Sequence, residues 1–320
     1  MPGGAGDPIA WQESTGARAP VSIERFTSSG SSMSTPEPTQ RDEPAETATG
    51  APAAEEEAPR AASRLDLLPS PVFVLILGLT GIAGWLSWTR GEEAWFDGGT
   101  VYAPFVLILG AWIVSITLHE YVHSVLAYRF GDRALRGSGY LRLNPFGFRE
   151  LFAGLLMPVA FLVLGGFGMT GPALHLDRSA VGSRAGRSLI ALAGPVLNLV
   201  LALALVLVVN ALIPEGSATN NWLIVGLMYV CFLNVTAALI NLLPVPGTDG
   251  FDAIAPYLPE KAAGLARSAG IFGVIAVFAV LWLPGVHTAF LDLMYTLLGL
   301  VGLNETYIGF GQLLFQFWVG

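Results

Sequence analysis

The stretch VYAPFVLILGAWIVSITLHEYVHSVLAYRFGD, residues 101–132, decides the fold class of this chain. Its first seventeen residues carry no charge, and His119, Glu120 and His123 then follow within five positions. As a helix, a run of this kind can cross the roughly 30 Å of hydrocarbon in a bilayer. A charge at the centre of such a helix costs about 2.5–3.5 kcal/mol, so ionisable residues there are expected to have a function.

The composition extends this interpretation to most of the chain. Of 320 residues, 53% are hydrophobic and 12% are charged, which is too apolar for an ordinary soluble domain. We therefore expect an all-α polytopic membrane protein with about five or six transmembrane helices. The apolar segments long enough to span a bilayer lie at about 71–89, 101–128, 187–213 and 222–243, with 269–284 just long enough.

The first part of the chain has a different composition. Residues 1–69 are rich in Ala, Pro, Glu and Ser and hold too little apolar surface to offset the entropy of ordering, which predicts a disordered acidic tail before a transmembrane domain at 70–320. The net charge is −8 and no basic surface is evident, so we expect no nucleic-acid partner. The single cysteine, Cys231, lies in an apolar run and excludes a thiolate zinc site.

The apolar segment 151–170 is predicted to be re-entrant rather than spanning. Pro158 and a glycine cluster at 165–168 make it a poor straight helix. If it enters and leaves on one side, and the N-terminal tail is cytoplasmic, 15 of the 16 basic residues are cytoplasmic and only Arg90 is outside. This is the distribution that the positive-inside rule prefers.

The residues His119 to His123 form the pattern HExxH. Positions i and i+4 lie on one face of a helix, so both imidazoles can reach one metal ion while Glu120 projects beside them. Zinc lowers the pKa of a bound water to about 7, and a neighbouring carboxylate can accept the proton of that water as it attacks a carbonyl. The alternative is a pair of histidines hydrogen-bonded to neighbouring helices, with Glu120 as their partner.

Zinc held by two histidines needs a further protein ligand. His175 and His287 lie in loop-like or segment-end contexts that are typical of ordinary polar residues. Asp249 follows an apolar helix that Pro244 and Pro246 should end, and irregular backbone at membrane depth is tolerated only where protein or a watery cavity covers it. Asp249 is the favoured ligand, and Asp252 in the same stretch is its rival.

The order of crossings supports this choice. His119 and His123 fall late in a helix that runs outside to inside, so the metal should lie in the cytoplasmic half of the membrane. Asp249 arrives on the same side only if 222–243 also runs outside to inside. That requires 151–170 not to cross, in agreement with the charge distribution.

Three motifs together resemble the site-2 protease family of intramembrane zinc metalloproteases: HEYVHSVLAYRFGD from His119, ALAGPVLNLVLAL from Ala191 and NLLPVPGTDG from Asn241. The first matches the family's HExxH helix with a following Gly-Asp, the second its Gly-Pro-x-x-Asn, and the third its Asn-x-x-Pro-x-Pro-x-x-Asp-Gly. The resemblance covers about 70–285 and is closest to minimal bacterial members without an inserted soluble domain. Thr248 departs from it, since the family usually has Leu there.

The resemblance implies one Zn²⁺ per chain bound by His119, His123 and Asp249, with Glu120 as the general base. Asn198 and Asn241 would line the site and hold substrate backbone, or else form helix–helix hydrogen bonds. The implied activity is hydrolysis of peptide bonds in or near transmembrane segments of other proteins, in the plasma membrane of a bacterium, with the site on the cytoplasmic side. The partners would be a transmembrane protein substrate and the lipid bilayer.

Two other functions are open at this stage. One is a proteolytically silent membrane scaffold that keeps the fold. The presence of all inferred ligands and of the base argues against it. The other is an ion transporter, and the presence of only one compact set of ligands argues against that function. The zinc endopeptidase is the leading hypothesis.

Overall fold

The computed structural model describes residues 68–97, 102–171, 177, 179–213 and 218–318. All regular elements in these ranges are helices. Almost all of the predicted tail, residues 1–69, lies outside the described residues, so its disorder remains a prediction.

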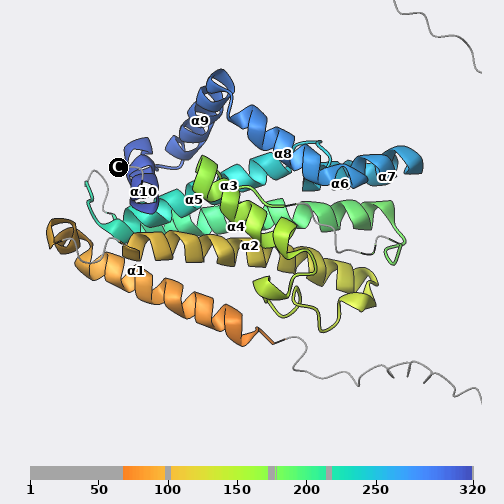
Figure 1. The fold of residues 1–320 in the computed structure, drawn as a ribbon, viewed down its shortest axis with the longest axis horizontal. Coiled ribbons are helices and arrows are strands. Elements are labelled where there is room, and N and C mark those ends of the chain that lie inside the picture. The colour runs from red at the N-terminus through yellow and green to blue at the C-terminus, as the bar shows by residue number, and fades with distance from the viewer. Residues whose placement is uncertain (1–67, 98–101, 172–176, 178, 214–217, 319–320) are drawn as a thin grey trace, which may run out of the picture. The chain divides into compact units, whose positions relative to one another are not determined.

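Four long apolar helices form the body of the domain: α1 (Pro71–Asp97), α2 (Tyr102–Phe130), α4 (Arg184–Leu212) and α5 (Trp222–Asn241). Each contains a stretch long and apolar enough to cross a membrane. In Figure 1, α2, α4 and α5 run along the same direction, and α1 lies against α2 at an angle to them. The first four predicted spans are therefore confirmed as helices, with ends shifted by up to eight residues.

The helix α5 is the centre of this bundle. Of its most apolar stretch 78% of the residues are buried, against 22% for α1. It contacts α1, α2 and α4, and α4 in turn contacts α2. Its aromatic side chains Tyr229 and Phe232 are fully buried in the main apolar cluster together with Trp112 of α2. A helix that is apolar all round, as α5 is, is stable only with protein or lipid on every side.

The segment predicted to be re-entrant forms a short helix and then returns. A π-helical turn (Phe152–Leu156) continues into α3 (Met157–Gly165). Together they rise about 21 Å at 1.5 Å per residue, less than the roughly 30 Å of a bilayer core. The chain then runs back without regular structure until Gly171 lies directly against the carbonyl of Ala153. The segment thus ends beside its own beginning, in agreement with re-entry.

The returning residues 166–171 are attached to α5. The N–H of Gly168 donates to Thr236 Oγ1 at 2.9 Å, and Asn241 Nδ2 donates to Thr170 Oγ1 at 2.5 Å. These contacts progress toward the C-terminal end of α5. The side chain of Thr236 therefore satisfies a backbone N–H that would otherwise be unpaired in a buried, non-helical segment, and Asn241 binds a side chain of the same segment.

The fifth predicted span, 269–284, is shorter than expected. The helix α8 (Gly270–Leu281) has only 12 residues and follows α7 (Glu260–Ser268) across a bend of 63°. The described part of the chain therefore has four spans, or five if this bent pair counts as one. Of the five or six transmembrane helices expected, five are found only when the bent pair is counted as one span.

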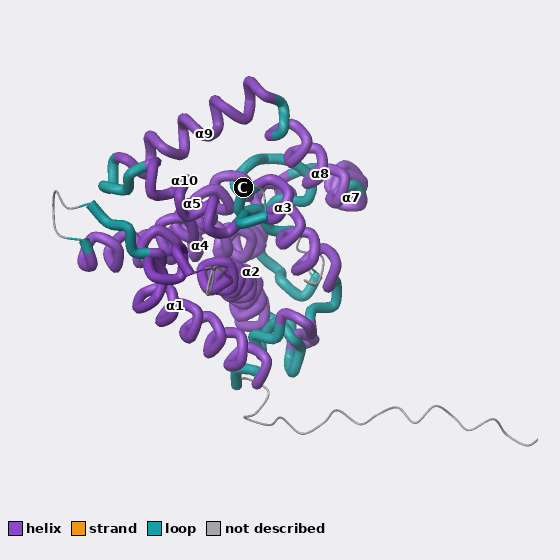
Figure 2. The backbone as a smooth tube through the Cα atoms, turned by 60° about the vertical axis from the view of Figure 1, so that its left-hand side comes forward, coloured by secondary structure: helices purple, strands orange, loops and turns teal. Residues whose placement is uncertain are grey.

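The last described residues, whose topology the sequence left open, form two helices. These are α9 (Pro284–Gly299) and α10 (Glu305–Phe315). In both Figure 1 and Figure 2, α8 and α9 lie on the side of the bundle opposite α1. The helix α10 returns to contact α5 and α2, where Phe315 stacks on Phe105 with ring centroids 5.2 Å apart.

Candidate metal centre

The HExxH residues lie on the buried face of α2. His119 and His123 are one helical turn apart, and their exposed fractions are 1% and 0%. Glu120 is also buried, close enough to both imidazoles and to Asp249 for their charges to act on it. Ionisable side chains this deep in a membrane-spanning bundle need partners, and a metal ion between them is one such partner.

A tight turn after α5 delivers the third side chain. The helix ends at Asn241, and the following chain turns through Gly247, whose φ of +95° is a conformation that favours glycine. The short helix α6 (Asp249–Ile254) then begins with Asp249. The predicted broken helix is confirmed, and it places Asp249 opposite α2.

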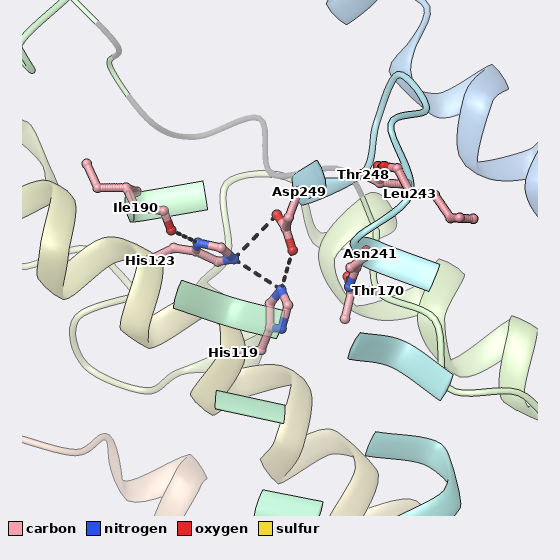
Figure 3. Close-up of polar contacts among 8 residues, drawn as sticks. All are labelled: His119, His123, Thr170, Ile190, Asn241, Leu243, Thr248 and Asp249. Carbon is pink, nitrogen blue, oxygen red and sulfur yellow. Dashed lines mark hydrogen bonds and ion pairs between the residues drawn. The ribbon is translucent and has the colours of Figure 1, made fainter. Parts of the chain in front are cut away.

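The three side chains lie close enough together to bind one metal ion, with one ligand atom from each within 4.8 Å of the others. Two ligand atoms at about 2.05 Å from a tetrahedral zinc ion lie about 3.3 Å apart. The Nε2 atoms of His119 and His123 are 3.1 Å apart, His119 Nε2 is 3.1 Å from Asp249 Oδ2, and His123 Nε2 is 3.5 Å from Asp249 Oδ1. Figure 3 shows both rings and the carboxylate converging on one point. Asp249 Oδ2 is buried and faces His119 Nε2, as expected for two groups that bind the same ion.

The carbonyl of Ile190 orients His123 from the neighbouring helix α4. His123 Nδ1 lies 2.7 Å from this carbonyl oxygen (Figure 3), which sets Nδ1 as the protonated nitrogen and leaves Nε2 free to bind a metal. Pro195 lies inside α4 just beyond this point and has no N–H to donate to the preceding turn. The carbonyl that Pro195 leaves without a helical donor is that of Ala191, so no local signal in the sequence pointed to Ile190.

Gly194 gives the two imidazoles the space they occupy. A Cβ atom at this position would collide with His123 Nε2 and with the Cε1 and Nε2 atoms of His119. The helix α4 therefore approaches α2 so closely at the metal group that only glycine fits. This is the physical reason for the glycine in the Gly-Pro-x-x-Asn motif.

We expect Gly194→Ala to lower zinc affinity by more than the 10- to 100-fold typical of changes around a metal site, since the new methyl group displaces both imidazoles. Zinc content after dialysis against a graded chelator measures this. Gly81→Ala is the matched control, because nothing lies within 4 Å of a Cβ atom at Gly81 in α1. Wild-type zinc affinity in Gly194→Ala would contradict the placement of α4 against the site.

The two predicted site-lining asparagines have different surroundings. Asn198 is one turn after Gly194 on α4, and both polar atoms of its buried amide lack a hydrogen-bond partner among the described residues. An unsatisfied buried amide costs about 1–3 kcal/mol, which suggests that it has a partner during function. Asn241 donates to Thr170 and so holds the re-entrant segment beside the site (Figure 3).

Thr248, the departure from the family pattern, has a role in the turn itself. Its buried hydroxyl lies 2.5 Å from the carbonyl oxygen of Leu243 and 2.9 Å from that of Val245. It donates to these carbonyls within the turn that follows α5. The carbonyl of Val245 also accepts from the backbone N–H of Thr248 at 3.0 Å, so a leucine would lose only the hydroxyl contacts. This chain therefore adds side-chain hydrogen bonds at the residue before Asp249.

Tyr140 is a further buried group near the base that the sequence did not reveal. Its ring stacks on Phe148 with centroids 4.6 Å apart, and its hydroxyl oxygen accepts from the N–H of Arg149 at 3.1 Å. Burial, together with the charge of Glu120, raises the pKa of Tyr140 to about 12. The phenol therefore stays protonated at neutral pH.

In the part of the chain that the structure describes, the other candidate ligands do not join the group. Asp252 Oδ1 accepts from Arg267 Nε at 3.1 Å instead. His287 lies on α9 with its ring 5.3 Å from that of Phe167. His175 lies outside the described residues. Among the described residues, the group that could hold a metal ion is His119, His123 and Asp249.

Fold and site together define a multi-pass helical membrane protein with a buried metal-binding group of two histidines and an aspartate. The model of peptidase family M50 matches residues 104–218. A protein of Mycobacterium tuberculosis named "Putative zinc metalloprotease Rip2" is 35% identical over 257 residues, 80% of this chain and 96% of that protein. A protein of Mycolicibacterium smegmatis with the same name is 34% identical over 256 residues, with the same coverage.

A protein of Bacillus subtilis named "Putative zinc metalloprotease YwhC" is 33% identical over 183 residues, 56% of this chain and 80% of that protein. No solved structure matches the chain. The chain belongs to peptidase family M50, the site-2 proteases, and the resemblance seen in the three motifs is confirmed.

Proposed function

We propose that this protein is a zinc endopeptidase that hydrolyses peptide bonds in or next to transmembrane segments of other membrane proteins. The observation that carries the proposal is the buried group of His119, His123 and Asp249, with ligand spacing suited to one zinc ion, inside a bundle of membrane-spanning helices. The family and the names of the relatives support the same activity. A silent scaffold would have no reason to retain this spacing.

The residues of the site divide the reaction between them. His119, His123 and Asp249 would hold the zinc ion, which when bound supplies a lowered water pKa and polarises the peptide carbonyl. Glu120 accepts a proton from the attacking water and passes it to the departing amine. Asn198, whose amide has no hydrogen-bond partner among the residues that the structure describes, would bind the peptide backbone of an unwound substrate. The surrounding helices exclude bulk water, which strengthens each of these electrostatic interactions.

The proposed orientation places the site end of the bundle in the cytoplasm of a bacterium, across its plasma membrane. Basic residues gather where α2 and α5 end and α4 begins: Arg129, Arg133, Arg136, Arg142, Arg149, Arg184, Arg187, Lys261 and Arg267. The positive-inside rule then favours a cytoplasmic location for this end. Cleavage would release a fragment of the substrate on that side.

The proposal predicts metal-dependent cleavage by the purified protein. In detergent, zinc-loaded protein should cut a single-span fluorescent substrate, lose this activity on chelation and regain it when about one zinc ion per chain is restored. The measurement is product formation on gels, with the cut position found by mass spectrometry. Zinc-loaded protein that leaves a panel of transmembrane substrates intact would favour the scaffold.

A further inference from the structure

Two cavities join the metal group to the basic end of the bundle. The inner cavity, of about 30 Å³, is lined by His123, Asp249, Arg187 and Arg267 among others. At 10–15 Å³ for each water, it holds about two water molecules, enough for the attacking water. Arg187 and Arg267 line it as well as the outer cavity, so a carboxylate formed at the metal group is within their reach.

The outer cavity is much larger and is lined by three arginines. Its volume is about 610 Å³, and Arg187, Pro256 and Arg267 line both cavities, so the two are adjacent. Arg184 lines the outer cavity as well, and Glu260 is the acidic residue among its lining groups. The positive-inside rule explains basic residues at this end of the bundle, but not their convergence on a cavity adjoining the metal group.

Two of the arginines are held in place by their Nε atoms. Arg187 Nε donates to the carbonyl of Val181 at 3.0 Å, and Arg267 Nε donates to Asp252 Oδ1 at 3.1 Å. A guanidinium carries further N–H groups on its two terminal nitrogens, in a planar fork that matches a carboxylate. Both side chains are therefore positioned by the protein before any ligand arrives.

The proposed reaction produces an anion at the inner end of this passage. Water oxygen bonds to the carbonyl carbon, the C–N bond breaks, and the amine nitrogen takes a proton. One fragment then ends in a carboxylate and the other in an amine. Every substrate yields this carboxylate, whatever its sequence. A fixed cluster of guanidinium groups beside the site is suited to bind it by charge-assisted hydrogen bonds.

We propose that the outer cavity is a carboxylate-binding subsite that receives the new C-terminus of the cleaved fragment. This inference rests on the proposed proteolytic function. The arginines stabilise the product carboxylate as it leaves the metal group and draw that fragment toward the basic end of the bundle. An acidic side chain of the substrate near the cut would offer the same chemistry, and the test separates the two sources.

The test is equilibrium binding to zinc-loaded Glu120→Gln protein, which binds without cutting. The probes are three short fluorescent Ala/Leu peptides: one with a C-terminal carboxylate, one with a C-terminal amide, and one with the amide and a Glu side chain near its end. We expect the acid to bind about tenfold more tightly than the amide, as for one charge-assisted hydrogen bond. Arg187→Gln and Arg267→Gln should remove this difference, while Arg142→Gln, an exposed arginine outside both cavities, should keep it.

The peptide with the Glu side chain identifies the source of the carboxylate. If it binds like the amide, the subsite receives the new C-terminus; if it alone binds tightly, the subsite reads a substrate side chain and the assignment to the product is overturned. Equal binding of all three peptides also overturns the proposal. Arginine-dependent stabilisation by phosphatidylglycerol in mixed micelles would then assign the cavity to a lipid headgroup.

The outcome is independent of whether the protein is a protease. A wild-type protein that never cuts, but distinguishes acid from amide through Arg187, would refute the proposed function and leave an anion site. A protein that cuts but binds the peptides equally would keep the function and refute the subsite.

Discussion

Glu120→Gln should retain zinc and lose cleavage by about 10²- to 10⁴-fold, the range that a general acid–base residue supplies. Glu120 is buried beside the metal group but is not one of the three side chains whose ligand atoms converge. The amide has nearly the same size as the carboxylate and cannot accept a proton from water at neutral pH. The measurement is the cleavage rate of the single-span substrate, with zinc content of the same sample.

Glu305→Gln, at an exposed position at the start of α10, makes the same chemical change as a control and should leave the rate unchanged. Retained cleavage in Glu120→Gln would show that another group accepts the proton. Loss of zinc along with activity would mean that Glu120 is itself a ligand, which would contradict the geometry described above.

Asp249→Asn should reduce zinc from about one ion per chain to a small fraction and abolish cleavage. An amide oxygen is neutral and a weak ligand for zinc, whose protein ligands are imidazole, thiolate and carboxylate. With two histidines left, the loss in affinity should exceed the 10- to 100-fold that changes around the ligands cause. The zinc affinity is obtained by measuring the zinc content of the protein with elemental mass spectrometry across a series of free zinc concentrations.

Asp292→Asn on α9 is the control, because Asp292 is exposed and its substitution removes the same charge. Normal zinc content in Asp249→Asn would move the ligand assignment to Asp252 or His175. Asp252 is paired with Arg267, so an assignment to Asp252 would also require this ion pair to break in the metal-bound protein.

The four long helices could be predicted from the sequence because the bilayer imposes a simple rule. A segment of about 20 apolar residues must form a helix to satisfy its own backbone, whatever its neighbours are. The same rule predicts the structure of shorter apolar segments less well. The run 269–284 met the length limit as a sequence, but its helix has only 12 residues and follows a sharp bend. The length and apolar composition of the run do not reveal such a bend.

The metal site likewise has a part that the sequence predicts and a part that only the fold determines. His119 and His123 were predictable because four residues of helix bring them together without help from the rest of the chain. Asp249 needed the broken helix and the number of crossings, and the sequence left Asp252 as a rival. The fold decides between them, because α6 directs Asp249 at the imidazoles and places Asp252 against Arg267.

The sequence alone determined that this is a helical membrane protein with an HExxH helix and three family motifs, because these depend on apolar length and on spacing within one element. Only the tertiary structure decided which surfaces touch. It brought the Ile190 carbonyl to His123, made Gly194 necessary and gathered the arginines of the outer cavity. Such contacts join residues distant in the chain, and no local periodicity encodes them.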